Sequence, residues 1–530
     1  MDVWSWICEL PNSVEGTESH SPPMKFEIAS EKNDDKLDNS TRSIHLKAER
    51  TSGSDSEAAV IFTVCLQGFH PHNAHKPLWV SEKCHLSSEK PFLPLLLQLL
   101  QEIISHSPTA HDSTCPRSQL QKLKPDPIAW IMDSHTPESL STFFNLVFTM
   151  RLFWLCAFHA PPEAGSLYFH SLLAPVLQTA SSKLASSVLR TFFITVGVDT
   201  ELCFMRTLGY IITKLHLIKE LDVGLLGLKT LLPSPKFSYA NEAHGLWILK
   251  GYAPVMTMKL ARTNTVQKTQ FSGIDAKESI LRYSLAHHQL EAHVQLDYTV
   301  GFYDGFIQVR ARVDNIRLHL ARLGFSQNDD VDDFVEEKHF PSRVRVWVGP
   351  EIGSTYCAGL SLGRSTENKE CEVETKRIVE GNFEKSQGSN VKALAKSSRR
   401  TRSRSWRMDQ DAEGNAAIFD VVLHDNTTGQ EVGSWRPKGD DPAHGLRGRY
   451  VRANRAFNKS GSVVIAGDEY GEEVGWRLSK EMEGSVLKWR IGGEFWVSYL
   501  PNQAKGSYFE TRYIEWCDEV DLPLIHGKTT

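Results

Sequence analysis

The chain has 530 residues, of which 41% are hydrophobic and 23% charged, and its 59 basic and 64 acidic side chains give a formal net charge of −5. This length favours two domains, and the apolar fraction is typical of a soluble globular protein and excludes wholesale disorder. The near balance of charge excludes a global attraction to nucleic acid or anionic membranes, so such binding would require a local basic patch.

The first residues do not resemble a targeting signal. Residues 1–24 contain no lysine or arginine and carry acids at Asp2 and Glu9, so neither a secretory signal nor a transit peptide is expected. The nine cysteines are dispersed, and none lies in a C-x-x-C pair, which favours a reducing, intracellular compartment. We therefore expect a cytoplasmic protein, with the nucleus as the alternative location.

The N-terminal part changes from polar to apolar along its length. Residues 1–57 are mostly polar and are predicted to be largely flexible, with a short strand at "SIHLKA"; a second strand is predicted at "AAVIFTVCL". Between Pro91 and Val223 the apolar segments exceed ordinary strand length, and those that begin near Thr136 and Asp199 carry helix-start signals. The sequence predicts a mainly helical domain over 58–233.

The most apolar window of the chain, residues 143–158, lies within this helical region. It is shorter than the roughly 20 residues of a membrane-spanning helix, and Arg151 interrupts it. We expect a buried core helix here and no transmembrane segment.

From residue 234 onwards, apolar and polar residues alternate, which is the pattern of half-buried β-strands. In 290–300 the apolar set includes Leu290, Val294 and Tyr298; in 306–320 the alternation shifts near Asn315, which predicts a β-bulge. Short turns containing Gly, Asn or Asp separate the later segments. The predicted fold class is α+β, with an antiparallel β-sandwich or barrel-like domain over 234–530.

A basic stretch, "KALAKSSRRTRSRSWRMDQ", lies between two predicted strands, and we predict a flexible basic loop over 385–412. It could be a solvated excursion, a nuclear-import or RNA-contact segment, or a loop read by a kinase. Trp406 is the only aromatic residue among its arginines, so the nucleic-acid signal is weak. Ser403 and Ser405 are the candidate phosphorylation sites.

A second basic stretch, "SWRPKGDDPAHGLRGRYVRANRAFNKSG", mixes cations with aromatic residues and glycines. Loops on a rigid β scaffold often carry binding function, although arginines also stack on aromatic rings for structural reasons. We predict a surface for an anionic ligand or a protein partner, formed by Arg436, Lys438, Arg447, Arg449, Tyr450, Arg452 and Arg455.

Motifs of catalytic or metal sites are incomplete. The string "GLSLG" around Ser361 resembles a hydrolase elbow, but a polar loop follows it rather than a helix. The C-terminal "GKTT" lacks the first glycine of a phosphate loop, and no G-x-G-x-x-G occurs. His70, His72 and His75 share a loop, and Glu291 and His293 share a strand face, without a standard ligand spacing. No catalytic residue, metal site or cofactor is predicted.

Taken whole, from "MDVWSWICELP" through "WRPKGDDPAHGLRGRYVRANRAFN" to "GEFWVSYLPN", the sequence resembles a plant protein family whose members are sometimes labelled erythronate-4-phosphate dehydrogenase family proteins. The resemblance extends over nearly the full chain and supplies no site residues. Its label implies hydride transfer, which requires a βαβ nucleotide-binding unit with a glycine turn.

The primary hypothesis is a non-catalytic plant protein that binds a protein partner or an anionic ligand through the basic, aromatic stretch, with Ser403 and Ser405 as regulatory sites. Two alternatives stay open. One is an enzyme of unrecognised type, a dehydrogenase by the family label alone. The other is a lipid-binding β domain, which would require an apolar internal cavity.

Overall fold

The computed structural model of the chain describes residues 2–10, 23–32, 41–52, 58–69, 77–110, 122–168, 171, 176, 183–220, 237–256, 287–324, 338–363, 371–384, 390–403, 406–424, 463–466, 473–500 and 511–525. The chain forms two compact units. The first contains Met1–Phe237, Tyr252–Gln289 and Ala321–Asp332, and the second contains Ser238–Gly251, Leu290–Leu320 and Asp333–Thr530. Each unit therefore consists of three stretches that are separated in the sequence, whereas the sequence predicted two consecutive domains with a boundary at residues 233–234.

The first unit opens with the short helix α1 (Val3–Glu9) and an antiparallel sheet, the N-terminal sheet, and both begin within the segment predicted to be largely flexible. Its described strands are β1 (Met24–Lys32), β2 (Thr41–Ser52), β3 (Ala58–Gln67), β4 (Trp79–Val80) and β5 (Cys84–His85). The predicted strand at "SIHLKA" lies within β2, whereas the prediction of flexibility is wrong for β1 and for the remaining residues of β2. These strands read as polar because part of each is exposed, while Ile28, Ile44 and Leu46 are buried.

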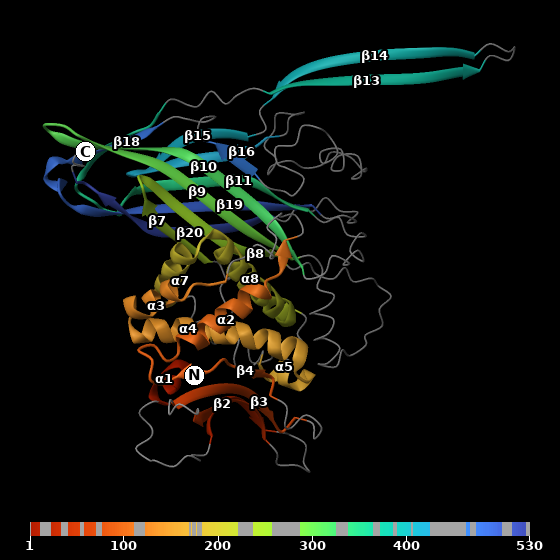
Figure 1. The fold of residues 1–530 in the computed structure, drawn as a ribbon. Helices are drawn as coiled ribbons and strands as arrows, with labels where there is room; N and C mark the ends of the chain where they lie inside the picture. The colour runs from red at the N-terminus through yellow and green to blue at the C-terminus, as the bar shows by residue number, and fades with distance from the viewer. Residues whose placement is uncertain are drawn as a thin grey trace. The chain divides into compact units, whose positions relative to one another are not determined.

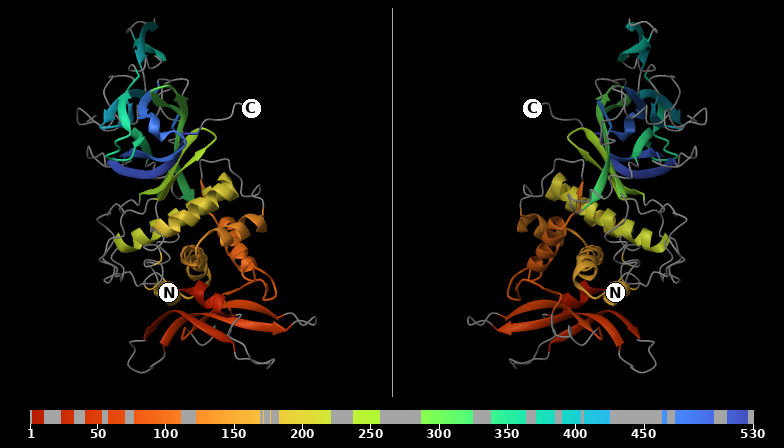
Figure 2. Two further views of the ribbon diagram at one scale, coloured as in Figure 1. Left: turned by 90° about the vertical axis from the view of Figure 1, so that its left-hand side faces the viewer. Right: turned by 90° about the vertical axis from the view of Figure 1, so that its right-hand side faces the viewer.

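The helices of the first unit pack on one face of this sheet (Figure 2). The described ones are α2 (Leu93–Ser105), α3 (Pro125–Ser134), α4 (Pro137–Trp154), the π-helical turn η4 (Leu155–His159), α5 (Pro162–Tyr168), α7 (Lys183–Val196) and α8 (Val198–Glu220). The predicted helix start at Thr136 is confirmed. The Thr136 hydroxyl accepts from the backbone N–H of Ser139 at 3.3 Å, and Pro137 occupies the first turn.

Helix α4 is the core helix of this unit. Phe143, Phe144 and Phe153 are fully buried, and Phe143 packs against Phe192 of α7 with ring centres 5.5 Å apart. Among the described residues, 137–159 form the one helical stretch long and apolar enough to cross a membrane, and 83% of its apolar window is buried inside the structure. That burial matches the core helix expected from the sequence.

The second unit is built mainly on two antiparallel sheets (Figure 1). The large sheet has the described strand order β12-β18-β10-β9-β8-β7, with β17 and β6 also paired to β10. Its strands are β6 (Thr109–Ala110), β7 (Phe237–Ala243), β8 (Leu246–Met256), β9 (His287–Phe302), β10 (Phe306–Gly324), β12 (Cys357–Ser361), β17 (Val463–Ala466) and β18 (Val474–Ser479). Parts of β7 to β10, and all of β6, belong to the first unit.

The second of these sheets, which we call the C-terminal sheet, has the described order β15-β16-β11-β19-β20. Its strands are β11 (Lys338–Pro350), β15 (Trp406–Glu413), β16 (Ala416–Leu423), β19 (Val486–Leu500) and β20 (Thr511–Pro523). β11 pairs with β19 over its whole length, with a register shift between Pro341 and Arg343.

Three buried tryptophans pack the large sheet against the C-terminal sheet. Trp247 of β8 stacks on Trp489 of β19 with ring centres 5.9 Å apart, and Trp476 of β18 meets Trp489 edge-on at 5.3 Å. Gly251 lets the Trp516 ring approach, because a Cβ at this position would lie 2.3 Å from that ring. Both sheets are open, so the antiparallel β prediction holds and the barrel-like alternative does not.

The predicted irregularity in β10 is present. Val309, Ala311 and Val313 are buried, and the buried set then continues with Ile316 and Leu318. The spacing of three between Val313 and Ile316 shifts the alternation around Asn315, as a β-bulge does.

The basic stretch predicted to be a loop forms strands instead. Strand β14 (Asn390–Ser403) pairs with β13 (Cys371–Glu384) in a two-stranded ribbon, and β15 follows at Trp406 (Figure 1). Within 385–412, the predicted flexible loop, only 385–389 and 404–405 lie outside the described residues. The register explains the difference. Glu372 and Glu374 stand at positions opposite Arg402 and Arg400, and opposite charges at paired positions favour pairing.

Candidate functional site

The seven predicted binding residues, Arg436, Lys438, Arg447, Arg449, Tyr450, Arg452 and Arg455, lie outside the described residues. The structure does show where their segment joins the sheets. It follows β16, which ends at Leu423, and precedes β17, which begins at Val463. Of the candidate phosphorylation sites, Ser403 ends β14 and Ser405 lies outside the described residues.

Where β16 ends, the outer face of the C-terminal sheet carries four side chains that we call the Arg343 cluster: Arg343, Asp420, Trp496 and Tyr513. The Arg343 guanidinium donates from Nε to Asp420 Oδ1 at 2.8 Å and from Nη2 to Oδ2. Its Cζ lies 5.0 Å from the centre of the Trp496 ring, within cation–π range. The Trp496 and Tyr513 rings are 5.2 Å apart.

Strand register assembles this cluster. Arg343 of β11 is paired with Trp496 of β19, which is paired with Tyr513 of β20. On the other side of β11, Arg343 is paired with Val422 of β16, two residues from Asp420. Four strands that lie up to 170 residues apart in the sequence therefore contribute to one surface. Each side chain points outward because its strand neighbours, such as Val344 and Phe495, fill the core.

Tyr513 is the exposed member of the cluster, with 51% of its surface accessible. Partial burial, followed by the negative charges of Glu494 and Glu515, raises the pKa of the Tyr513 phenol to about 12. The hydroxyl is therefore protonated at neutral pH, and it hydrogen-bonds to the side chains of Glu494 and Glu515, so the exposed ring is the part of Tyr513 that a ligand can contact. Exposed tyrosine and tryptophan beside arginine are the residue types enriched at protein-binding hot spots.

A second arginine–tryptophan stack lies further along the same face. The Arg490 Cζ is 4.9 Å from the centre of the Trp347 ring. Gly492 makes this stack possible, because a Cβ there would lie 2.1 Å from Trp347 Cζ2. The outer face of the C-terminal sheet thus repeats one motif, an arginine that stacks on a half-buried indole.

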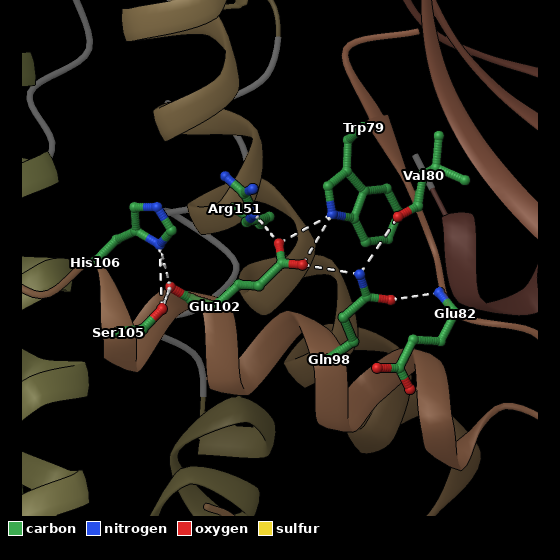
Figure 3. Close-up of polar contacts among 8 residues, drawn as sticks. All are labelled: Trp79, Val80, Glu82, Gln98, Glu102, Ser105, His106 and Arg151. Atoms are coloured by element: carbon green, nitrogen blue, oxygen red, sulfur yellow. Dashed lines mark hydrogen bonds and ion pairs between the residues drawn. The ribbon is translucent and has the colours of Figure 1, made fainter.

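The first unit contains a polar network that sequence reasoning missed (Figure 3). The Glu102 carboxylate accepts from Trp79 Nε1 at 2.9 Å, from Gln98 Nε2 at 2.8 Å and from Arg151 Nε. Gln98 Oε1 also accepts from the backbone N–H of Glu82 at 2.6 Å. We call Glu102 and its three side-chain donors the Glu102 hub.

The Glu102 hub ties together three elements, namely β4, α2 and α4. Trp79 and Arg151 are buried, with 7% and 8% of their surfaces exposed. A carboxylate whose oxygens already accept hydrogen bonds from three donors is better suited to holding these elements together than to acting as a catalytic base. The sequence signal was the i, i+4 spacing of Gln98 and Glu102 on one helix face, but nothing local points to Trp79 or Arg151.

The polar side chains of β9 do not have the arrangement of metal ligands. Glu291 faces His319 of β10, with Oε2 and Nδ1 3.1 Å apart. Burial, followed by the positive charges of Lys250 and Arg317, lowers the pKa of His293 to about 4. Cations beside a histidine oppose metal binding. Within the part of the chain that the structure describes, no group of three or more His, Cys, Asp or Glu could hold a metal ion.

The hydrolase-like string also takes a different structure from the motif. Ser361 ends strand β12 rather than standing on a strand-to-helix turn, and its hydroxyl donates to the Gly475 carbonyl at 3.2 Å. The geometry of a nucleophile elbow is therefore not present at this serine.

No family model and no curated protein matches the chain. Solved structures with a distant likeness include the Clostridium perfringens NetB toxin in the membrane-inserted form, at 7% identity and a TM-score of 0.19 over 54% of this chain and 94% of that one. A pore-forming protein matches at 9% identity and 0.19 over 54% and 94% of the two chains. The Clostridium perfringens delta-toxin matches at 7% and 0.20 over 54% and 96%. At such TM-scores the likeness carries no argument about this chain.

Proposed function

We propose that the chain is a non-catalytic binding protein that holds a partner protein between the Arg343 cluster and the basic stretch 434–461. The observation that carries this proposal is the Arg343 cluster itself. It presents a tryptophan, an arginine and a half-exposed tyrosine on one sheet face, near the end of β16 at Leu423, the last described strand before the basic stretch in the sequence.

Charge indicates the kind of partner surface. The stretch 434–461 contains seven lysines and arginines and two acids, Asp440 and Asp441. Arginine forks bind carboxylates in a bidentate manner, as Arg343 binds Asp420. The proposed partner therefore presents an apolar centre that packs on Tyr513 and Trp496, and aspartates or glutamates that face the basic stretch rather than Glu494 and Glu515 beside Tyr513.

The lipid-binding alternative receives less support from the described interior. It would require an apolar cavity between the sheets, and that space holds the stacked rings of Trp247, Trp476 and Trp489, all fully buried. The dehydrogenase alternative depends on the family label, because the described strands of the second unit pair in antiparallel fashion, without a parallel βαβ unit.

The test is quantitative affinity capture with the tagged full-length chain from its native cells. One variant is Tyr513→Ala, a second combines Arg436→Ala, Arg449→Ala and Arg452→Ala, and the matched control is Trp130→Ala, an exposed aromatic residue at 54% on α3. We expect a protein whose recovery falls by about tenfold or more in both surface variants and not in the control. Equal recovery of every protein by all four chains would contradict the proposal.

A further inference from the structure

One end of the second unit presents large apolar side chains to solvent from four separate segments. Ile352 is 84% exposed, Ile525 60%, Val486 56% and Tyr303 44%. They lie on the β11–β12 connection, after β20, at the start of β19 and on the β9–β10 turn. Single exposed apolar residues are ordinary, but a group of them at one end of a sandwich indicates a binding surface.

The connection between β18 and β19, residues 479–486, holds these segments together. Ser479 N–H donates to the Tyr356 carbonyl at 2.8 Å, and Leu524 N–H donates to the Ser485 carbonyl at 2.9 Å. Lys480 Nζ lies 5.9 Å from the centre of the Phe302 ring, beside Tyr303. We call this group of segments the loop end; in Figure 1 the tip of β9 and β10 and the blue C-terminal elements meet there.

The loop end is rigidly built rather than a set of free loops. Tyr303 N–H donates to the Phe306 carbonyl at 3.0 Å, and the two rings stack with centres 4.8 Å apart. The Arg477 guanidinium covers the Phe306 ring of this stack, and its Cζ lies 4.2 Å from the ring centre. Glycines with positive φ close two of the turns, Gly353 at 79° and Gly484 at 82°. Preformed surfaces bind with less loss of conformational entropy.

Charge at the loop end is mainly negative. Its described segments, 302–306, 350–356, 479–486 and 523–525, carry one cation, Lys480, which lies 2.9 Å from Glu483. Arg477, which covers the Phe306 ring, adds a second exposed cation. The acids on the same segments are Asp304, Glu351, Glu481 and Glu483, all exposed. An acidic rim around apolar tips complements a partner with lysines or arginines around an apolar centre, and it repels an anionic membrane.

This surface is distinct from the Arg343 cluster. Arg343 lies near the start of β11, whereas the loop end begins after Pro350 at the end of that strand. The basic stretch returns to the large sheet at Val463, which pairs with Leu318, while the loop end adjoins Phe306 at the start of β10. The two surfaces therefore lie at opposite ends of the second unit.

We propose that the loop end is a second docking surface, which binds an apolar, lysine- or arginine-bearing segment of a partner protein. Ile352 inserts into the partner, Tyr303, Val486 and Ile525 extend the apolar contact, and the acids at the rim pair with the partner's cations. This proposal is independent of the function assigned to the Arg343 cluster.

A random peptide library displayed on phage tests it, with the full-length chain as the bait. The wild-type chain should enrich peptides that combine lysine or arginine with large apolar residues. Enrichment should fall by about tenfold or more for the double variant Ile352→Ser, Ile525→Ser and for Glu351→Lys, Glu481→Lys. It should persist for the control Val464→Ser, which is 62% exposed and paired with Arg317 far from the loop end. Tyr513→Ala should also retain it, which separates this proposal from the first.

Every other result overturns the proposal. The absence of enrichment on the wild-type chain, acidic peptides among those enriched, or equal enrichment on the loop-end variants would each remove the docking surface. Thermal melts of the variants are the control for folding, because these side chains are exposed and their replacement should leave the melting temperature within a few degrees. A peptide set lost with Val464→Ser would place the binding elsewhere on the chain.

Discussion

The Glu102 hub and the Arg343 cluster contain the same three chemical groups, a carboxylate, an arginine and a tryptophan, in two different arrangements. In the hub the indole Nε1 of Trp79 donates to the Glu102 carboxylate, and Arg151 is buried. In the cluster the Arg343 guanidinium stacks on the indole face of Trp496, at a surface where Tyr513 is half-exposed. The two carboxylate side chains are similarly exposed, 24% for Glu102 and 17% for Asp420, and the arginine side chains differ, 10% for Arg151 against 36% for Arg343. Burial of the arginine therefore distinguishes the set of groups that holds the fold together from the set that faces solvent.

The largest effect is expected from breaking the hub. Glu102→Leu removes the acceptor and leaves the Arg151 charge buried without its carboxylate, so it should lower the free energy of unfolding by ~3–5 kcal/mol. Urea denaturation of the full-length chain measures this loss. Glu82→Ala is the matched control, because Glu82 contributes only its backbone N–H to the network and its side chain is exposed. Equal midpoints for the two variants would show that the hub does not stabilise the first unit.

A pH dependence should come from His293, where two cations and burial lower the folded pKa to about 4. Because the unfolded histidine binds its proton near its ordinary pKa of about 6.5, stability is present above that pH and is lost as the pH falls toward 4. Between pH 7 and pH 5 the loss should be about 2 kcal/mol.

His293→Gln removes this titration. The wild-type chain should therefore lose about 2 kcal/mol more than the variant between pH 7 and pH 5, as measured by urea denaturation at each pH. An identical pH dependence of the two chains would mean that burial and the charges of Lys250 and Arg317 do not lower the pKa of His293 in the folded chain.

A smaller effect is expected at the second arginine–tryptophan stack. Gly492→Ala places a methyl group where the Trp347 ring lies, which should cost ~1–3 kcal/mol and displace the indole from Arg490. Tryptophan fluorescence and thermal melting report the two consequences. Gly305→Ala is the control, because no atom lies within 4 Å of the place that its new methyl group would take, and the two variants should differ clearly in both readouts.

The smallest effect is expected from the Arg343–Asp420 ion pair, in which the arginine is the more exposed partner, at 36% against 17%. Asp420→Asn should change the free energy of unfolding by less than ~1 kcal/mol, because the Arg343 side chain is 36% exposed and water replaces much of the interaction. A loss as large as that of Glu102→Leu would abolish the distinction between the two clusters. The same variant should weaken partner binding, since Arg343 loses the group that orients its guanidinium.

Local sequence patterns predicted those elements whose structure is determined by neighbouring residues in the sequence. The helix start at Thr136 and the register shift near Asn315 are readable because capping and alternation are short-range properties. Strand β14 was missed because its structure does not follow from short-range properties of its own residues. Its strand structure comes with pairing to β13, and the arginines alone resemble a solvated loop. Strand β1 was missed because five of its nine residues are polar or charged, whereas strands were predicted at "SIHLKA" in β2 and "AAVIFTVCL" in β3.

The candidate surfaces depend on long-range register, which single-sequence reasoning does not supply. The Arg343 cluster needs β11, β16, β19 and β20 in one alignment, and the hub needs Trp79 and Arg151 beside a helix that carries Glu102. What the sequence did offer was composition, namely arginines and aromatic residues in the C-terminal half. The sheets determine which of them meet.

The most direct measurement of the central claim is photocrosslinking from the Arg343 cluster. A benzophenone amino acid replaces Tyr513 in the full-length chain, and Trp130 of α3 in a control chain, and both are irradiated in the native cells. The account predicts a covalent adduct with a protein rich in acidic residues from position 513, reduced by an excess of unlabelled wild-type chain and absent from position 130. An adduct that forms equally at both positions, or none at position 513, would contradict it.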